Sequence, residues 1–322
     1  MPRIAICTTA ALVALFTACR DGAPTIDAPS THRAGAIPLR AAGGGGGGGS
    51  TKYLTPTGQL DVLLDANPPA RTRYRIDYHN GRVIPGDADV YLIYYGDWST
   101  ADANAEQSLL ASLVSNIGLS PFANILTLYT NTSGQHPSGV IYYGGSSGDA
   151  YSHGAILTTA DVADIVNDQL ATGALPADPS GLFLVVASAD VYAEGLDSEY
   201  CAYHDWIEFN GTAARIGFIG SPRRSPAQCA PQAAGPNGSY EADAAASLVT
   251  AEIFSALTDP YFDAWFDRLG LEGADKCAWD FGQTYKAANG ALANIHLGLN
   301  DYLLQRFWVP TKNGGYCSLS AP

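Results

Sequence analysis

Two nearly continuous runs of apolar and aromatic residues, 89–95 and 181–187, constrain the fold of this chain more than any other feature of its sequence. Neither run alternates between apolar and polar positions, so each predicts a strand that is buried on both faces. Between them, two segments repeat apolar residues at helical spacing. The first occupies 109–117 and stops at Gly118, and the second follows Thr159. Strands that alternate with helices predict an α/β arrangement with parallel strands.

The rest of the folded part adds shorter strands and one long helix. Strands are predicted at 125–130, 140–143 and 302–309, and a hairpin is predicted at 206–209 and 214–219 around Asn210-Gly211. A helix is predicted at 241–257, because Pro260 prevents its continuation. Together these elements predict a three-layer domain of α/β to α+β class with a mixed central sheet.

The N-terminus has the pattern of an export signal. Arg3 gives a short positive start, and 4–18 is uncharged and mostly apolar. This stretch is shorter than the roughly 20 apolar residues that a membrane-spanning helix needs, and it fits a secretory signal. It ends in Leu-Phe-Thr-Ala-Cys at 15–19, which resembles a bacterial lipobox. We therefore predict a lipoprotein signal peptide at 1–19 with lipidation of Cys19. Plain secretion or a buried N-terminal helix are the alternatives.

The segment after the signal has the composition of a flexible linker. Residues 20–52 are rich in Ala, Gly, Pro and Thr, and they include an unbroken glycine run at 43–49. Such a segment cannot bury enough apolar surface to offset the entropy of ordering it. We predict a tether at 20–52 and a single folded domain at 53–322. The chain is thus expected to be exported and anchored to a membrane, in the periplasm or at the cell surface.

The charge balance excludes one class of partner. The 322-residue chain has 17 Lys and Arg against 31 Asp and Glu, a formal net charge of −14. Nucleic-acid binding requires clustered Lys and Arg, and the sequence contains no such cluster. The expected partners are the membrane, through the lipid anchor, and an extracytoplasmic ligand such as a cell-wall glycan or a protein.

Four cysteines remain in the predicted domain after Cys7 and Cys19 are assigned to the leader. An even number in an exported chain favours two disulfides. Of the three possible pairings we favour the one that joins neighbours along the chain: Cys201 with Cys229, and Cys277 with Cys317. The alternative reading takes Cys201 and His204 as half of a zinc site, although a second close pair is missing.

Six short segments stand in order along the folded part of the chain: 78–81 (Tyr-His-Asn-Gly), 89–98, 151–154 (Tyr-Ser-His-Gly), 182–191, 201–204 (Cys-Ala-Tyr-His) and 228–229 (Gln-Cys). Together they resemble landmarks of the phosphate-induced protein 1 family, whose plant members are the exordium-like extracellular proteins. The resemblance implies an exported protein linked to growth and nutrient status in plants. It implies no particular reaction.

A second resemblance lies inside the first. Some microbial relatives carry a His-Glu-x-x-Glu helix followed by a Glu-x-x-Asp-x-Cys segment, similar to zinc peptidases of the zincin type. In that motif two ligands one helical turn apart hold the metal, and the Glu beside the first ligand takes a proton from the bound water. Here Glu252, Glu272 and Asp275 keep the acidic positions, but Ala251 and Ser255 replace both helical ligands. Neither a methyl group nor a neutral hydroxyl is a good zinc ligand.

These resemblances imply a zincin-like architecture with no bound metal or other cofactor and no catalytic residues. We therefore expect an exported, lipid-anchored domain that acts as a binding or signalling module and retains a vestigial site. The alternative is a divergent, metallopeptidase-like hydrolase that uses Glu252, Glu272 and Asp275 with a further ligand such as His204.

Two other patterns were weighed as sites. Residues 144–148 match the Gly-x-Ser-x-Gly pattern of hydrolases, but the residues that follow predict a loop. A nucleophile elbow requires a strand that turns into a helix, so Ser146 is not expected to be a nucleophile. Tyr94 and Trp98 are expected in the core or at its rim, with a sugar-binding platform as the alternative.

Overall fold

The computed structural model describes residues 37–38, 74–100, 102–196 and 200–322. The predicted signal peptide with Cys19, all but two residues of the predicted tether, and the first part of the predicted domain lie outside the described residues.

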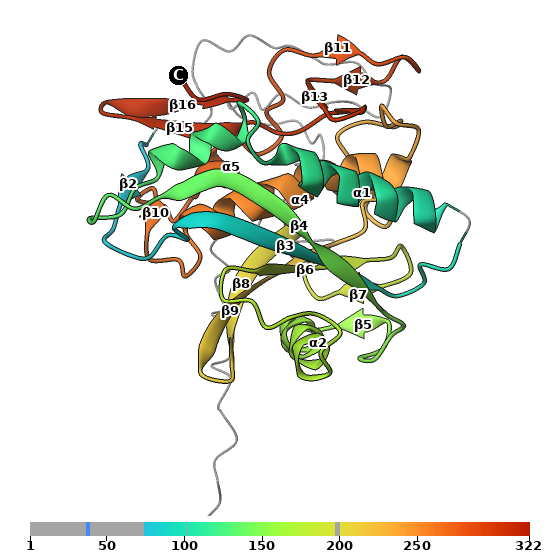
Figure 1. The fold of residues 1–322 in the computed structure, drawn as a ribbon. Coiled ribbons are helices and arrows are strands. Elements are labelled where there is room, and N and C mark those ends of the chain that lie inside the picture. Colours follow the sequence, from blue (N-terminus) through green and yellow to red (C-terminus); the bar gives the residue numbers. More distant parts are fainter. Residues whose placement is uncertain (1–36, 39–73, 101, 197–199) are drawn as a thin grey trace, which may run out of the picture.

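A mixed sheet of five main strands lies at the centre of the described domain (Figure 1). In the order in which they lie, the strands are β8 (Tyr200–Phe209), β9 (Thr212–Ile219), β6 (Leu182–Ala187), β3 (Gly86–Tyr95) and β4 (Pro137–Asp149). All but β8 run parallel to their neighbours, and β8 runs antiparallel to β9. The Asn210-Gly211 turn joins β8 to β9, with both residues at positive φ as the sequence predicted. The predicted fold class and mixed sheet are confirmed.

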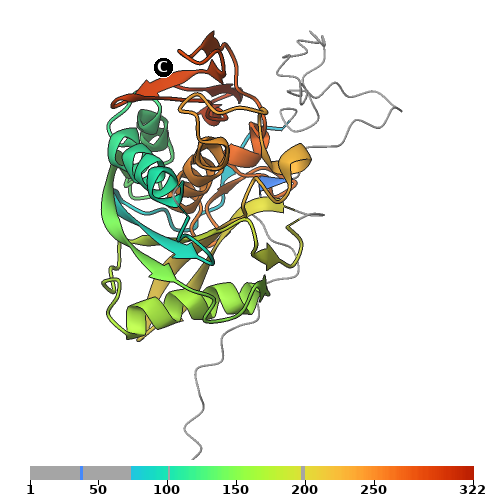
Figure 2. The same ribbon diagram turned by 90° about the vertical axis from the view of Figure 1, so that its right-hand side faces the viewer.

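Helices cover both faces of this sheet. The helices α1 (Ala103–Ile117) and α4 (Tyr240–Thr258) lie on one face, and α2 (Thr159–Ala171) lies on the other, as Figures 1 and 2 show. Alternate residues of β3 and β6 pack into two separate apolar cores, one on each face. This explains why the two runs at 89–95 and 181–187 are almost entirely apolar, because these two central strands are buried on both faces.

The order of connections determines where the loops gather. The chain passes from β3 through α1 to β4, and then from β4 through α2 to β6, which lies on the other side of β3. The loops that leave β3 and β4 therefore turn toward opposite faces of the sheet. In open sheets of this kind, a crevice forms at the carboxyl ends of the two strands.

The segment that follows α4 covers the outer side of this helix (Figure 1). Its elements are β10 (Trp265–Phe266), α5 (Gly273–Lys276), β11 (Tyr285–Lys286), β12 (Leu292–Ala293), β13 (Ile295–Leu297), β14 (Asn300–Tyr302), β15 (Phe307–Thr311) and β16 (Gly314–Ser318). The remaining short elements are β1 (Ile37–Pro38), β2 (Asp77–Tyr78), the 3₁₀ helix η2 (Ala123–Leu128), β5 (Ile156–Leu157), β7 (Tyr192–Ala193) and α3 (Pro226–Cys229). The sheet covers one side of α4 and the elements from β10 to β16 cover the other, so α4 is buried from Glu241 to Thr258.

The strand predicted at 125–130 is wrong. Most of these residues lie in η2, where Ile125 and Leu126 are fully buried. A short apolar run suits a buried strand and a buried helical turn equally well, and its pattern alone does not distinguish them.

The strand predicted at 302–309 is interrupted. β14 ends at Tyr302 and β15 begins at Phe307. Between them the side chain of Asn294 takes the place of a neighbouring strand. Its amide nitrogen donates to the backbone oxygen of Leu304 at 2.6 Å, and its oxygen accepts from the Leu304 amide at 2.9 Å.

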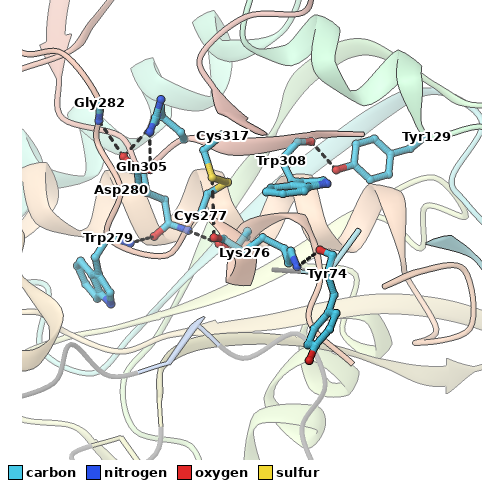
Figure 3. Close-up of a disulfide and its surroundings, with 12 residues drawn as sticks. Tyr74, Tyr129, Lys276, Cys277, Trp279, Asp280, Gly282, Gln305, Trp308 and Cys317 are labelled. Carbon is cyan, nitrogen blue, oxygen red and sulfur yellow. Dashed lines mark hydrogen bonds and ion pairs between the residues drawn. A yellow bond between two sulfur atoms is a disulfide. The ribbon is translucent and has the colours of Figure 1, made fainter. Parts of the chain in front are cut away.

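Both favoured disulfides are confirmed. Cys201 of β8 is bonded to Cys229 of α3, and Cys277 after α5 is bonded to Cys317 of β16 (Figure 3). A bonded Cys201 cannot ligate zinc, so the alternative zinc site with His204 is wrong. Two disulfides are typical of a protein that is exported to an oxidising compartment. Among the described residues, no helix has the length and apolar character needed to cross a membrane.

One piece of the predicted tether contacts the domain. The two residues of β1 pair antiparallel with β8, opposite Ala202 and Tyr200. The central sheet is thereby extended beyond β8 by a segment that the sequence assigned to a linker.

Candidate functional site

The end of α4, the start of α5 and the middle of β8 bring ionisable side chains together. His204 Nδ1 lies 3.1 Å from Glu252 Oε2, and its Nε2 lies 3.7 Å from Glu272 Oε1. The same Nε2 lies 3.3 Å from the backbone oxygen of Asp259. Asp275 raises the pKa of the Glu272 carboxyl through its charge, and Ser255 lowers it through a hydrogen bond. We call these six residues the His–Glu cluster: His204, Glu252, Ser255, Asp259, Glu272 and Asp275.

Local structure explains how α4 contributes to the cluster. Glu252 and Ser255 are three residues apart, so they share one face of the helix. The helix ends at Asp259, whose Oδ1 accepts hydrogen bonds from the backbone amides of Asp263 and Ala264 at 2.8 Å and 2.7 Å. These bonds fix the turn that sends the chain back along the outer side of the helix.

The short helix α5 positions the other two acids. Glu272 is its N-cap residue, and Asp275 Oδ2 accepts a hydrogen bond from the Glu272 backbone amide at 3.0 Å. This is one half of a capping box, an arrangement that satisfies the free amides at a helix start. Asp275 therefore has a structural task in addition to its place in the cluster.

The cluster is sealed from solvent, and its charge is suppressed. His204, Glu252 and Glu272 are 1%, 0% and 0% exposed. Burial, followed by the nearby carboxyls of Asp259, Asp275 and Glu252, raises the pKa of Glu272 well above its usual value. Burial also raises the pKa of Asp259 and lowers that of His204. The cluster therefore favours a neutral imidazole and a protonated Glu272.

The donor set does not fit a catalytic zinc ion. Ala251 has no donor atom, and both ring nitrogens of His204 already lie within hydrogen-bond distance of protein oxygens. Within the part of the chain that the structure describes, no group of three or more His, Cys, Asp or Glu is arranged to hold a metal ion. We therefore derive no metal-dependent step at this cluster.

Comparison with known proteins places this sequence in a family. The family model described as the phosphate-induced protein 1 conserved region matches residues 76–312. This chain belongs to the phosphate-induced protein 1 family. Its sequence is 26% identical over 306 residues to Protein EXORDIUM-like 3 of Arabidopsis thaliana, a match that covers 83% of this chain and 90% of that protein. It is 24% identical over 271 residues to Protein EXORDIUM-like 5 of the same plant, covering 72% and 75%. No solved structure matches the chain.

Within this member of the phosphate-induced protein 1 family, the structure brings most of the predicted site together. Glu252, Ser255, Glu272 and Asp275 all join one cluster, and His204 completes it as the alternative hypothesis suggested. The cluster also includes Asp259, which the sequence analysis missed. Its signal is the Asp-Pro pair after the long helix, in which Pro260 was used as a helix stop and Asp259 was not included among the site residues.

The Gly-x-Ser-x-Gly segment forms no nucleophile elbow. Ser146 lies inside β4, which continues to Asp149, and a turn follows rather than a helix. The loop predicted after 144–148 is present, and the expectation that Ser146 is not a nucleophile agrees with this geometry.

Replacing Glu272 with Gln is expected to flatten the pH dependence of stability. The pKa of Glu272 is raised in the folded protein from an ordinary value of 4.5. The stabilisation from the retained proton is therefore fully present below that ordinary value, and it is lost as the pH rises toward the folded-state pKa. In calorimetry between pH 5 and pH 8, we expect the melting temperature of the wild type to fall more steeply than that of Glu272→Gln.

Glu208→Gln, on the exposed side of β8, serves as the control and should follow the wild type. Parallel curves for the wild type and Glu272→Gln would contradict the assignment, because they would mean that Glu272 ionises alike in the folded and unfolded chains.

Proposed function

We propose that this protein is an exported, lipid-anchored binding or signalling module in which the metallopeptidase-like site is vestigial and serves as a buried structural network. The observation that carries this proposal is the state of His204. Its two ring nitrogens face Glu252 and the Asp259 carbonyl in a cluster with no exposed surface. A substrate cannot reach these groups, and the imidazole has no nitrogen left for a metal.

Export and anchoring rest on the N-terminal sequence and the cysteines. The leader at 1–19 ends in a lipobox-like segment with Cys19, and both disulfides of the domain are formed. Plain secretion of the same domain is the alternative location, and it would leave the proposed role of the cluster unchanged.

A divergent hydrolase is the second candidate function, and one observation favours it. Glu252, Glu272 and His204 come from three separate elements and still meet at one place, as the groups of an active site do. For catalysis this cluster would have to open to solvent and gain a metal or a free base, and its burial argues against both.

One preparation tests both parts of the proposal. Full-length protein is extracted from the membrane fraction without chelator, and its zinc content and peptidase activity on casein are measured. We expect the protein to be recovered with the membranes, to contain far less than one zinc ion per chain, and not to cleave casein. Recovery of the mature chain only in the soluble fraction would contradict the anchor. Stoichiometric zinc that disappears in both Glu272→Ala and His204→Ala would overturn the non-catalytic assignment.

A further inference from the structure

A polar crevice lies at the carboxyl ends of β3 and β4, where the loops of the two strands part toward opposite faces of the sheet. Two adjoining hollows form it, with volumes of about 340 Å³ and about 710 Å³. Asp97 and Trp98, in the loop after β3, line both hollows. The crevice is distinct from the His–Glu cluster, since Glu241 at the first turn of α4 lines the smaller hollow and the cluster involves the far end of that helix.

The walls of the crevice are held in place before any ligand arrives. The backbone amide of Asp97 donates to Ser188 Oγ at 3.0 Å, and that hydroxyl donates to Asp190 Oδ1 at 2.6 Å. The Tyr151 hydroxyl donates to the other oxygen of Asp190. Loops after β3, β4 and β6 are thus joined through one carboxylate. Gly96, at φ +101°, permits this approach, because a Cβ there would lie 2.0 Å from Ser188 Oγ.

Trp98 presents a fixed aromatic surface between the two hollows. Its Nε1 donates to the backbone oxygen of Tyr95 at 3.1 Å, and its ring packs against the ring of Tyr94 with centroids 4.9 Å apart. The side chain is only partly buried, so part of the ring remains available to a ligand. An aromatic ring held by its polar edge offers a rigid apolar surface at low entropic cost on binding.

The polar groups around this ring include both donors and acceptors. Side chains with hydroxyl or amide groups line the larger hollow: Ser99, Asn104, Gln107 and Ser146. Each of these side chains can donate and accept hydrogen bonds, as each hydroxyl of a sugar can. A cationic ligand would need acceptors alone.

Three acids of the crevice have partners within the protein: Asp97, Glu106 and Glu241. Asp97 accepts from the amide and the hydroxyl of Ser99 at 3.0 Å and 2.6 Å. Glu106 and Glu241 in the smaller hollow share Arg223, at 3.3 Å and 2.9 Å. Arg223 therefore compensates part of the charge in the smaller hollow, and the bonds from Ser99 hold the Asp97 carboxylate in one orientation. Fixed carboxylates are further acceptors for sugar hydroxyls, beside the apolar stacking surface of Trp98.

We propose that this crevice binds a neutral oligosaccharide, with one sugar ring stacked on Trp98 and its hydroxyls bonded to the serine and amide side chains around it. The inference rests on the proposed function as a binding module and names its ligand class.

Calorimetric titration of the full-length protein in detergent with cellohexaose, chitohexaose and xylohexaose tests the inference. We expect at least one hexasaccharide to bind with a Kd below about 1 mM, and Trp98→Ala to weaken that binding by about tenfold or more. Trp206→Ala, at an exposed tryptophan of β8 outside the crevice, is the matched control and should change the Kd less than about twofold.

Asn104→Ala gives a second test that does not depend on the packing of Trp98. Asn104 is exposed in the first turn of α1, and alanine favours the helix, so this variant should fold normally. We expect it to weaken binding about threefold or more through loss of a hydrogen bond. Three results would each overturn the inference: binding of none of the sugars, sugar binding that both variants leave unchanged, or competition by hexalysine for the same site.

These outcomes are separable from a failure of the proposed function. Absence of sugar binding in a protein that lacks zinc and peptidase activity would remove the ligand class and leave the non-catalytic module. Shortening of a bound hexasaccharide during the titration, seen by chromatography, would contradict a non-catalytic protein while leaving the crevice as its binding site.

Discussion

Lys276→Met alone is expected to lower the free energy of unfolding by about 3–5 kcal/mol. The Lys276 ammonium lies 2.7 Å from Asp267 Oδ2, and both side chains are fully buried. It also donates to the backbone oxygen of Tyr74 (Figure 3) and lies over the Trp308 ring at 4.9 Å. Methionine fills a similar volume, so the main loss is that the Asp267 carboxylate remains buried without its counter-ion.

The double variant Asp267→Asn with Lys276→Met is the matched control. It removes both charges, and the asparagine oxygen can still accept from the backbone amides of Leu269 and Leu271, which bond Asp267 at 2.8 Å and 3.1 Å. We expect it to recover most of the loss in urea unfolding, because a buried ion pair can often be replaced by neutral groups at little cost. A single variant that loses less than about 1 kcal/mol would contradict this account of the pair.

Replacing both Cys277 and Cys317 with alanine is expected to lower the free energy of unfolding by about 4 kcal/mol. The bond joins residues 40 positions apart, and a cross-link of that length removes considerable entropy from the unfolded chain. It also fastens β16 to the end of α5 (Figure 3). Urea unfolding under non-reducing conditions measures the global effect, and hydrogen exchange measures the local one.

The Cys201–Cys229 bond provides the comparison. Its span of 28 residues predicts a similar global cost of about 3.5 kcal/mol. The local effects should differ. Hydrogen exchange should be faster in β15 and β16 when the Cys277–Cys317 bond is removed, and around β8 and α3 when the Cys201–Cys229 bond is removed. Equal loss of protection in both regions in both variants would show that the bonds act only through the unfolded state. Unchanged urea midpoints would contradict the expected costs.

Much of the fold could be predicted because its main elements have long, consistent patterns. The apolar runs of β3 and β6, the helical spacing in α1 and α2, and the Asn210-Gly211 turn each combine local preference with tertiary burial. The wrong predictions concern short apolar runs, whose pattern alone does not determine their secondary structure. Ile125 and Leu126 are buried by packing in a 3₁₀ helix, and Asn294 breaks the final strand by bonding Leu304. Neither cause is visible in local sequence.

Most residues of the candidate site could be predicted from the sequence, whereas the burial of their side chains could not. Helical spacing places Glu252 and Ser255 on one face, and the downstream segment suggested Glu272 as a neighbour. The complete burial of these side chains depends on the segment after α4, which packs over this helix, and on His204 from the sheet. The crevice gave less signal. The sequence offered Trp98 as part of a sugar-binding platform only as an alternative, because the crevice forms only where the loops after β4 and β6 lie beside the segment 96–98.

The burial of α4 on every side has a practical consequence for work with shortened forms of this protein. The helix supplies almost no surface of its own, and segments from both halves of the chain complete its surroundings. A fragment that ends after the hairpin, or one that stops before residue 260, would expose apolar area that only the missing piece can shield. Such fragments are expected to aggregate or be degraded rather than fold independently. The intact domain is therefore the smallest form suited to biochemical work.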